Sequence, residues 1–171
     1  MDNRQRALVA RYGGVYEHSP WVAECAAGVL SADAGIAELA AAMADCVDNA
    51  GRERQLALIR AHPDLAGKAG LRDELTAASS DEQKSAGLDQ CTPAELERFH
   101  TLNAAYKRKF GFPFVMAVRD SNRHAILAAF AERLNNGVEQ EIATALEQIH
   151  RIARLRLEVI EQQVVHEAGS S

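Results

Sequence analysis

His62 is the side chain of this 171-residue chain that we single out first for acid–base chemistry. An imidazole gains and loses its proton near neutral pH, so histidine is a common proton donor and acceptor. Pro63 disfavours helical geometry in the residue before it, which predicts that a helix ends at His62 and that the imidazole begins a loop. The same position also suits a histidine that only caps the C-terminus of a helix. Spacing alone favours this capping role over a catalytic one.

Arg156 is a charged residue in an otherwise apolar helical stripe. The stripe belongs to the last predicted helix and contains Ile142, Leu146, Ile149, Ala153, Leu157 and Ile160. A buried guanidinium without an anion is costly, so Arg156 needs a negatively charged or strongly accepting partner. A substrate is one candidate for that partner. An internal carboxylate, or a side chain that reaches out to solvent, is the other, and periodicity alone favours it.

The segment from Ser79 to Gln83 contains two overlapping capping boxes, Ser79 with Glu82 and Ser80 with Gln83. These pairs predict a helix that starts here. Capping explains the segment by itself, but the free N–H groups of a helix start also favour anions, so the same residues are candidates for contact with a ligand.

Helical periodicity and capping signals recur along the chain. They predict helices at about 20–28, 34–49, 52–61, 93–110, 122–135 and 138–165. The expected capping residues are Ser19 (with Pro20 at the first helical position), Thr92 (in a box with Glu95) and Ser121.

The run 112–118 is apolar, contains Pro113 and is too short for a helix, so we expect a buried extended segment there. Asn103 lies on the inward stripe of the preceding helix, between Phe99 and Tyr106. We expect its amide to hydrogen-bond the backbone of 112–118, and we assign it no catalytic role. Together these patterns predict an all-α fold, with one compact multi-helix domain over residues 1–171 and frayed ends at 1–5 and 167–171.

Composition narrows the class of protein. Apolar residues make up 47% and charged residues 25%, as in soluble globular domains. A net charge of -5 argues against a nucleic-acid partner, and no apolar run is long enough to span a membrane. The three cysteines are not closely spaced, so we expect no disulfide framework, a reducing compartment and a cytoplasmic location. No histidine pair has metal-ligand spacing, so we expect no metal site.

Six blocks of sequence, in order along the chain, resemble the 2-oxo-4-hydroxy-4-carboxy-5-ureidoimidazoline (OHCU) decarboxylases. The most specific of them are His62-Pro63-Asp64-Leu65 and Phe110-Gly111-Phe112-Pro113-Phe114. The others lie at 14–21, 79–88, 102–106 and 152–157. Because the blocks are spread over most of the chain, a chance resemblance is improbable.

The resemblance implies an all-α homodimer that converts OHCU to (S)-allantoin in urate degradation, with no metal or organic cofactor. It implies four catalytic side chains, His62, Glu82, Gln83 and Arg156. The residues that it implies for substrate binding are Pro63, Ser79, Ser80, Asp81, Glu82, Gln83, Phe114, Val115, Met116, Ala117, Val118 and Arg156.

In this interpretation His62 is the acid/base, and Glu82 either orients it or contacts the substrate. Gln83 and Arg156 hold polar atoms of the small ureidoimidazoline, and backbone N–H groups of 114–118 stabilise an oxyanion. Two alternatives stay open. One is a non-catalytic helical interaction module, in which these side chains only cap helices or pair internally. The other is a hydrolase or isomerase that acts on a related ureide.

Overall fold

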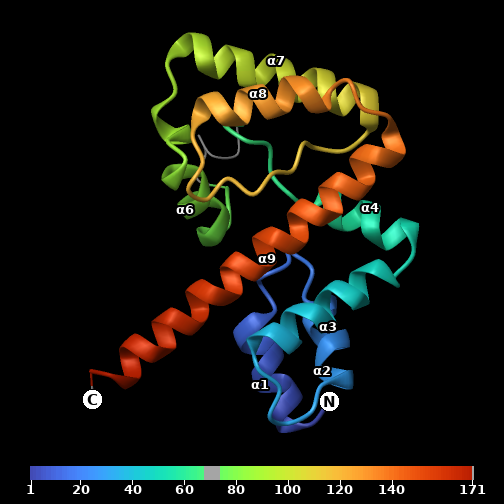
Figure 1. Ribbon diagram of the computed structural model, residues 1–171, viewed down its shortest axis with the longest axis vertical. Helices are drawn as coiled ribbons and strands as arrows, with labels where there is room; N and C mark the ends of the chain where they lie inside the picture. Colours follow the sequence, from blue (N-terminus) through green and yellow to red (C-terminus); the bar gives the residue numbers. More distant parts are fainter. Residues whose placement is uncertain (68–73, 171) are drawn as a thin grey trace. The chain divides into compact units, whose positions relative to one another are not determined.

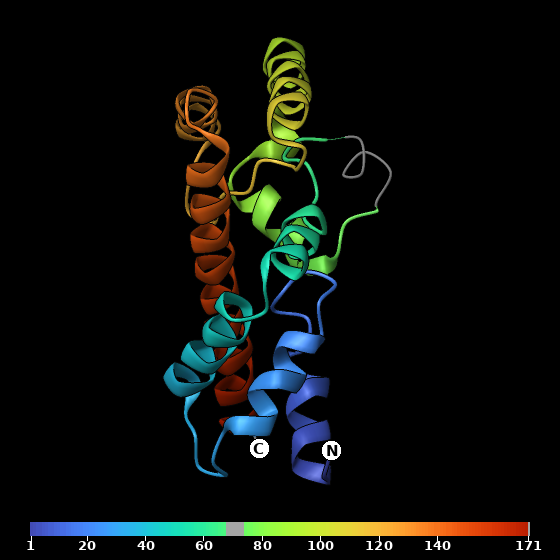
Figure 2. The same cartoon turned by 90° about the vertical axis from the view of Figure 1, so that its right-hand side faces the viewer.

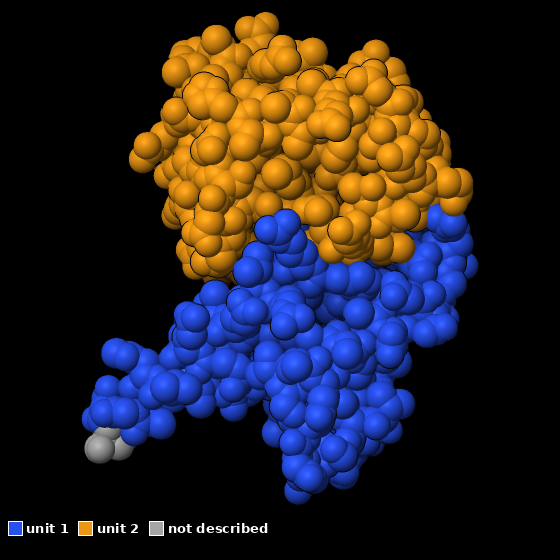
Figure 3. Space-filling model, viewed as in Figure 1, with its two compact units in different colours: residues 1–61, 149–171 blue, residues 62–148 orange. Residues whose placement is uncertain are grey.

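The computed structural model describes residues 1–67 and 74–170, and within these ranges it contains helices and no strand, which confirms the all-α prediction. The contacts group the chain into two compact units. Unit 1 comprises residues 1–61 and 149–171, and unit 2 comprises residues 62–148 (Figure 3). Each unit is described by itself.

Unit 1 is built on four short helices and the C-terminal part of a long one. The short helices are α1 (Asn3–Tyr12), α2 (Trp21–Val29), α3 (Ile36–Asp48) and α4 (Arg52–Arg60). The long helix is α9 (Val138–Ala168), which enters unit 1 at residue 149. Helix α2 packs against both α1 and α3 (Figure 1). Periodicity predicted α2, α3 and α4 close to their observed bounds.

The ends of the chain are more ordered than expected. Residues 3–5, which we expected to be frayed, belong to α1, because Asp2 and Gln5 form a capping box at its start. At the other end, α9 continues through Ala168. Ser171 lies outside the described residues.

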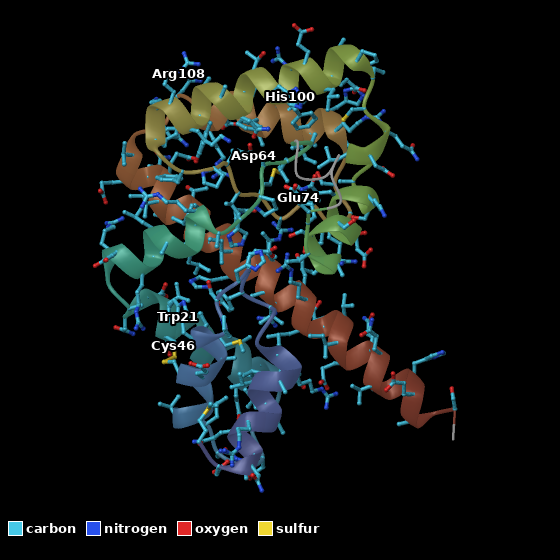
Figure 4. The ribbon with its side chains drawn as sticks, turned by 180° about the vertical axis from the view of Figure 1, so that it is seen from behind. Trp21, Cys46, Asp64, Glu74, His100 and Arg108 are labelled. Atoms are coloured by element: carbon cyan, nitrogen blue, oxygen red, sulfur yellow. A yellow bond between two sulfur atoms is a disulfide. The ribbon has the colours of Figure 1, made fainter. Side chains whose placement is uncertain are left out.

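The expectation of no disulfide is wrong. Cys25 on α2 and Cys46 on α3 are bonded, with their Cα atoms 6.2 Å apart, and Cys46 is labelled in Figure 4. The two cysteines are 21 residues apart in sequence, and the helical hairpin between them brings the sulfur atoms together. Local spacing carried no sign of this pairing. Cys91 is a free thiol.

Unit 2 contains α6 (Ala77–Ser85), the 3-10 helix η1 (Leu88–Gln90), α7 (Pro93–Phe110), α8 (Arg123–Arg133) and the first turns of α9. Helices α7 and α8 lie side by side (Figures 1 and 2). The chain that joins them passes beneath both helices in Figure 1. This joining chain contains the run 112–118, which is extended and largely buried, as predicted.

Four capping predictions are wrong, and one is confirmed. Thr76 caps α6 by accepting a hydrogen bond from Ser79 N, so the predicted boxes at Ser79 and Ser80 lie inside the helix. Asn122, not Ser121, caps α8. Ser19 does not cap α2, which has no side-chain hydrogen bond at its start, and the Ser19 hydroxyl donates to the Glu17 carbonyl oxygen instead.

The confirmed cap is the box of Thr92 and Glu95 at the start of α7, with Pro93 at the first position. Hydrogen bonds from the Thr92 backbone and hydroxyl hold the pKa of the partly buried Glu95 carboxyl below its usual range. At the other end, Gly111 closes the helix with a φ of 76°, a left-handed conformation that glycine adopts without strain.

Aromatic side chains form the centre of unit 2. Phe114 of the extended segment stacks on Phe130 of α8, with ring centroids 3.9 Å apart. Tyr106 of α7 meets the Phe114 ring edge-on at 5.5 Å. This packing ties the extended segment to α7 and α8. In the part of the chain that the structure describes, no helix is both long and apolar enough to cross a membrane.

We expect reduction of the Cys25–Cys46 bond to destabilise the chain, because the bond restricts the unfolded ensemble. For a loop of about 20 residues the loss is about 3 kcal/mol, or roughly 6–12 °C in the melting temperature. Thermal unfolding with and without dithiothreitol measures this difference. Cys91→Ser is the control and should keep the response to reductant, whereas Cys25→Ser/Cys46→Ser should lose it. Equal melting of the wild type in both buffers would contradict the expectation.

Candidate active site

His62 lies in a loop, as Pro63 predicted. Helix α4 ends at Arg60, two residues before His62, and the imidazole is 7% exposed. The loop that it begins belongs to unit 2, and Leu65 and Ala66 in the same loop are also buried. Because loop backbone has no helical partners, its buried peptide groups must find other ones.

Two side-chain amides supply those partners. Gln83 on α6 accepts a hydrogen bond from Ala66 N (3.1 Å) and donates to the Asp64 carbonyl oxygen (3.3 Å). Asn103 on α7 donates to the Leu65 carbonyl oxygen (2.9 Å). Our prediction that Asn103 binds the backbone of 112–118 is therefore wrong. Its amide holds the loop that carries His62.

The clamped loop has a tight conformation. Ala66 adopts a φ of 50°, a left-handed value that costs a non-glycine residue roughly 1–2 kcal/mol. Its N–H is the group that Gln83 binds, so the side chain of α6 stabilises the strained residue. Asp64 is held separately, because Lys107 Nζ lies 2.6 Å from its carboxylate. Figure 4 shows Asp64 below α7.

Helix α6 presents a buried polar face. Ser79, Glu82 and Gln83 are all buried, at the spacing of three and four residues that places side chains on one side of a helix. Asp81 is exposed and Ser80 is partly buried. A short helix with so many polar atoms away from solvent needs partners for them, and the loop of His62 is one of these partners.

A small cavity of about 140 Å³ lies next to this face. Ala66, Ser80, Gln83 and Leu88 are among the residues that line it. His62 and Glu82 are not among the described residues around it, so the cavity by itself does not define a site for proton transfer.

The extended segment presents peptide groups in unit 2. Phe114, Val115, Ala117 and Val118 are buried, and Met116 is partly exposed. The Ala117 N–H donates to Gln148 Oε1 at 3.0 Å, so this donor is already used within the protein. We predicted that N–H groups of 114–118 stabilise an oxyanion. The Ala117 N–H differs from the others in this role, because it already donates to Gln148.

Arg156 has the internal carboxylate partner that periodicity favoured. Its Nη1 atom lies 2.7 Å from Glu17 Oε2, and both side chains are almost completely buried within unit 1. The pair has no net charge, so the desolvation cost of each ion is offset by the other. Tyr16, the neighbour of Glu17, is bound to the same helix through its hydroxyl, which lies 2.8 Å from His150 Nδ1.

The structure brings most of the predicted residues into unit 2. His62, Pro63, the 79–83 face and the 114–118 segment belong to it, and Arg156 belongs to unit 1. Sequence reasoning missed the partners that position these residues. Glu17 pairs with Arg156, and Arg133 and Gln148 hydrogen-bond the backbone of Val115 and Ala117. No local spacing marked out these three partners. Among the described residues, no group of three histidine, cysteine or acidic side chains could hold a metal ion.

The predicted site residues of unit 2 include the His62 imidazole for proton exchange, the carboxylate of Glu82 and the side-chain amide of Gln83. Such a set suits an uncharged or anionic small molecule whose reaction depends on moving protons.

Comparison with known proteins gives matches over nearly the whole chain. The family model of OHCU decarboxylase matches residues 2–158. A protein of Haloferax volcanii named 2-oxo-4-hydroxy-4-carboxy-5-ureidoimidazoline decarboxylase is 48% identical over 151 residues, which are 88% of this chain and 87% of its own. A protein of the same name from Amia calva is 39% identical and covers 95% of both chains.

Solved structures agree with this. A crystal structure of (S)-allantoin synthase has a TM-score of 0.73 and 38% identity, and the match covers 91% of this chain and 50% of the other. A crystal structure of OHCU decarboxylase in the presence of (S)-allantoin has a TM-score of 0.70 over 88% of this chain and 98% of the other, and at 22% identity it supports the fold alone. By both sequence and fold, the chain belongs to the OHCU decarboxylase family.

Proposed function

We propose that this protein decarboxylates OHCU to (S)-allantoin in urate degradation, with His62 as the acid/base and with no metal or organic cofactor. The observation that carries the proposal is the 48% identity over most of the chain with a protein named for this activity. The geometry of unit 2 supports it, because the loop of His62 is clamped by side chains from two helices.

The substrate itself provides the electron sink for the reaction. The ring carbon that loses the carboxylate also carries a hydroxyl group and adjoins the unsaturated part of the imidazoline ring. When the carbon–carboxylate bond breaks, carbon dioxide leaves and the electron pair moves into the ring C=N group, whose nitrogen takes up a proton to give an enol. The enol hydroxyl then loses its proton to form the carbonyl of allantoin, and the neighbouring ring carbon gains one. The nitrogen therefore accounts for the one proton that is taken up overall.

His62 is proposed to move these protons. An imidazole can accept the hydroxyl proton and return a proton to carbon, because both of its forms are populated near neutral pH. Glu82 orients the imidazole or contacts the substrate directly. Protonation from one side of the ring gives a single enantiomer of allantoin, whereas the spontaneous reaction gives both.

Gln83 is proposed to contribute in two ways. Its amide oxygen and one of its N–H groups hold the His62 loop, so part of its role is to position that loop. A side-chain amide has a second N–H, and we propose that this N–H of Gln83 donates to the ureido group of the substrate. Pro63, Ser79, Ser80 and Asp81 complete the proposed binding residues of this region.

Arg156 is proposed to bind ring or ureido oxygens rather than the departing carboxylate. Strong pairing of a cation with that carboxylate would stabilise the ground state, which loses this charge as the reaction proceeds. Glu17 offsets the charge of Arg156, so the pair does not act as an unbalanced cation towards the departing carboxylate.

We also propose a homodimer, as the family resemblance implies, and a cytoplasmic location. The Cys25–Cys46 bond argues against that location, because disulfides are rare in a reducing cytosol. A cytoplasmic protein should carry these two cysteines as thiols in the cell, and a bond that is present in the cell would contradict the proposed location. Alkylation of cell extracts quenched in acid distinguishes the thiol from the disulfide form. Light scattering after size-exclusion chromatography measures the mass of the assembly.

His62→Ala should abolish the enzymatic reaction, since it removes the proposed proton carrier. Loss of one acid–base group typically costs about 10²–10⁴-fold in rate. OHCU is generated from urate with the two upstream enzymes, and the appearance of chiral allantoin is followed by circular dichroism. The exposed residue His124 provides the control, and His124→Ala should match the wild type. Racemic allantoin formed at one rate in all three samples would contradict the proposal.

Glu17→Gln should lower kcat and also lower KM for OHCU. The substitution keeps an oxygen acceptor for Arg156 but removes the balancing charge, so the guanidinium would hold the substrate carboxylate more strongly before it departs. Steady-state kinetics separates the two constants, and thermal unfolding checks that the variant is folded. Glu161→Gln removes a more exposed carboxylate that pairs with Arg11, so it should change neither constant. A rise in KM for Glu17→Gln would be the opposite of this expectation.

A further inference from the structure

The peptide groups on either side of Met116 are held by two different side chains of unit 2. Arg133 on α8 donates from Nη1 to the Val115 carbonyl oxygen at 2.7 Å. Gln148 on α9 accepts from the Ala117 N–H at 3.0 Å. Met116 itself is the partly exposed residue between two buried neighbours, and no described residue accepts a hydrogen bond from its N–H.

A fully buried carboxylate fixes the position of Arg133. Glu141 is 0% exposed and accepts hydrogen bonds from Arg133 Nε (2.8 Å), the Tyr106 hydroxyl (2.5 Å) and Asn136 Nδ2 (3.0 Å). The Arg133 guanidinium also lies over the Phe114 ring, 4.3 Å from its centroid. A guanidinium that is held by a carboxylate and an aromatic ring keeps a defined direction for its remaining N–H groups.

Tyr106 keeps this anchor intact over the working pH range. Burial, followed by its hydrogen bond to Glu141, raises the pKa of the Tyr106 hydroxyl above its usual value. The hydroxyl therefore stays protonated and continues to donate to the carboxylate. The anchor contains one negative and one positive charge, Glu141 and Arg133, so it adds no net charge beside the extended segment.

Peptide planarity turns these two contacts into a constraint on Met116. The carbonyl of one residue and the N–H of the next point in opposite directions across a trans peptide, and the described chain has no cis peptide. Because the Val115 carbonyl points to Arg133, the Met116 N–H points away from Arg133. Because the Ala117 N–H points to Gln148, the Met116 carbonyl points away from Gln148.

We infer that Arg133 and Gln148 are positioning residues, which aim the peptide groups of Met116 at the reacting small molecule. This rests on the proposed function, in which N–H groups of 114–118 stabilise negative charge on the substrate. Neither side chain is required to touch the substrate. The Met116 N–H serves as a preorganised donor because its direction is set before the substrate binds.

Gln148 gives the sharper test, because it is only partly buried and its exchange leaves the Glu141 anchor intact. Gln148→Leu removes the acceptor for the Ala117 N–H, whereas Gln148→Glu keeps an oxygen at that place. Release of the peptide between Met116 and Ala117 removes the constraint on the Met116 carbonyl and frees one side of the backbone that carries the Met116 N–H, which should lower kcat/KM roughly 10- to 100-fold in Gln148→Leu. Gln148→Glu should stay within about threefold of the wild type. The enantiomeric purity of allantoin should fall in the leucine variant alone, and the pH dependence of its residual rate should be unchanged.

Amide hydrogen exchange followed by NMR tests the contact without any turnover. The Ala117 amide should exchange slowly in the wild type and in Gln148→Glu, and faster in Gln148→Leu. Addition of (S)-allantoin should shift the Met116 amide resonance in the wild type. Arg133→Lys, which keeps one donor for the Val115 carbonyl, should lose less activity than Arg133→Met.

Two results would overturn the inference. One is wild-type turnover and enantiomeric purity in Gln148→Leu when its Ala117 amide has lost protection. The other is an equal loss of activity in the leucine and glutamate variants. A wild type that does not accelerate formation of (S)-allantoin overturns the proposed function instead, and in that case all variants show the spontaneous rate.

Discussion

Buried backbone outside helices needs hydrogen-bond partners, and in an all-helical protein no sheet is present to supply them. Unit 2 contains two such segments, the loop 62–66 and the run 112–118. Side chains meet the need in both places. Gln83 and Asn103 bind the first segment, and Arg133 and Gln148 bind the second. Backbone that carries the proposed chemistry is therefore held by the helices around it.

The same constraint applies to buried charge. Glu141 with Arg133, and Glu17 with Arg156, are ion pairs in which both partners are largely removed from water. Breaking such a pair is costly, whereas the intact pair adds no net charge to its surroundings. This suits chemistry in which a carboxylate must leave as neutral carbon dioxide, because an unbalanced cation would favour the charged substrate over the transition state.

Local patterns predicted the helices well and their caps less well. Apolar periodicity located α3, α7 and α9, because each has a stripe of apolar side chains that is buried. The predicted caps at Ser79 and Ser121 failed because Thr76 and Asn122 lie close by and offer equally good oxygen acceptors. Choosing between adjacent capping residues depends on where the helix packs. The Cys25–Cys46 bond was missed because it joins two helices that only their packing brings together.

The sequence by itself determined the all-α class, the extended segment, the family, and the loop position of His62, because these depend on local periodicity, on Pro63 and on motifs within short stretches. Only the tertiary structure decided which partner each buried polar group has. It paired Arg156 with Glu17 across 139 residues and directed Asn103 to Leu65 rather than to the extended segment. Hydrogen bonds act over about 3 Å, so such partners follow from packing and leave no trace in spacing along the chain.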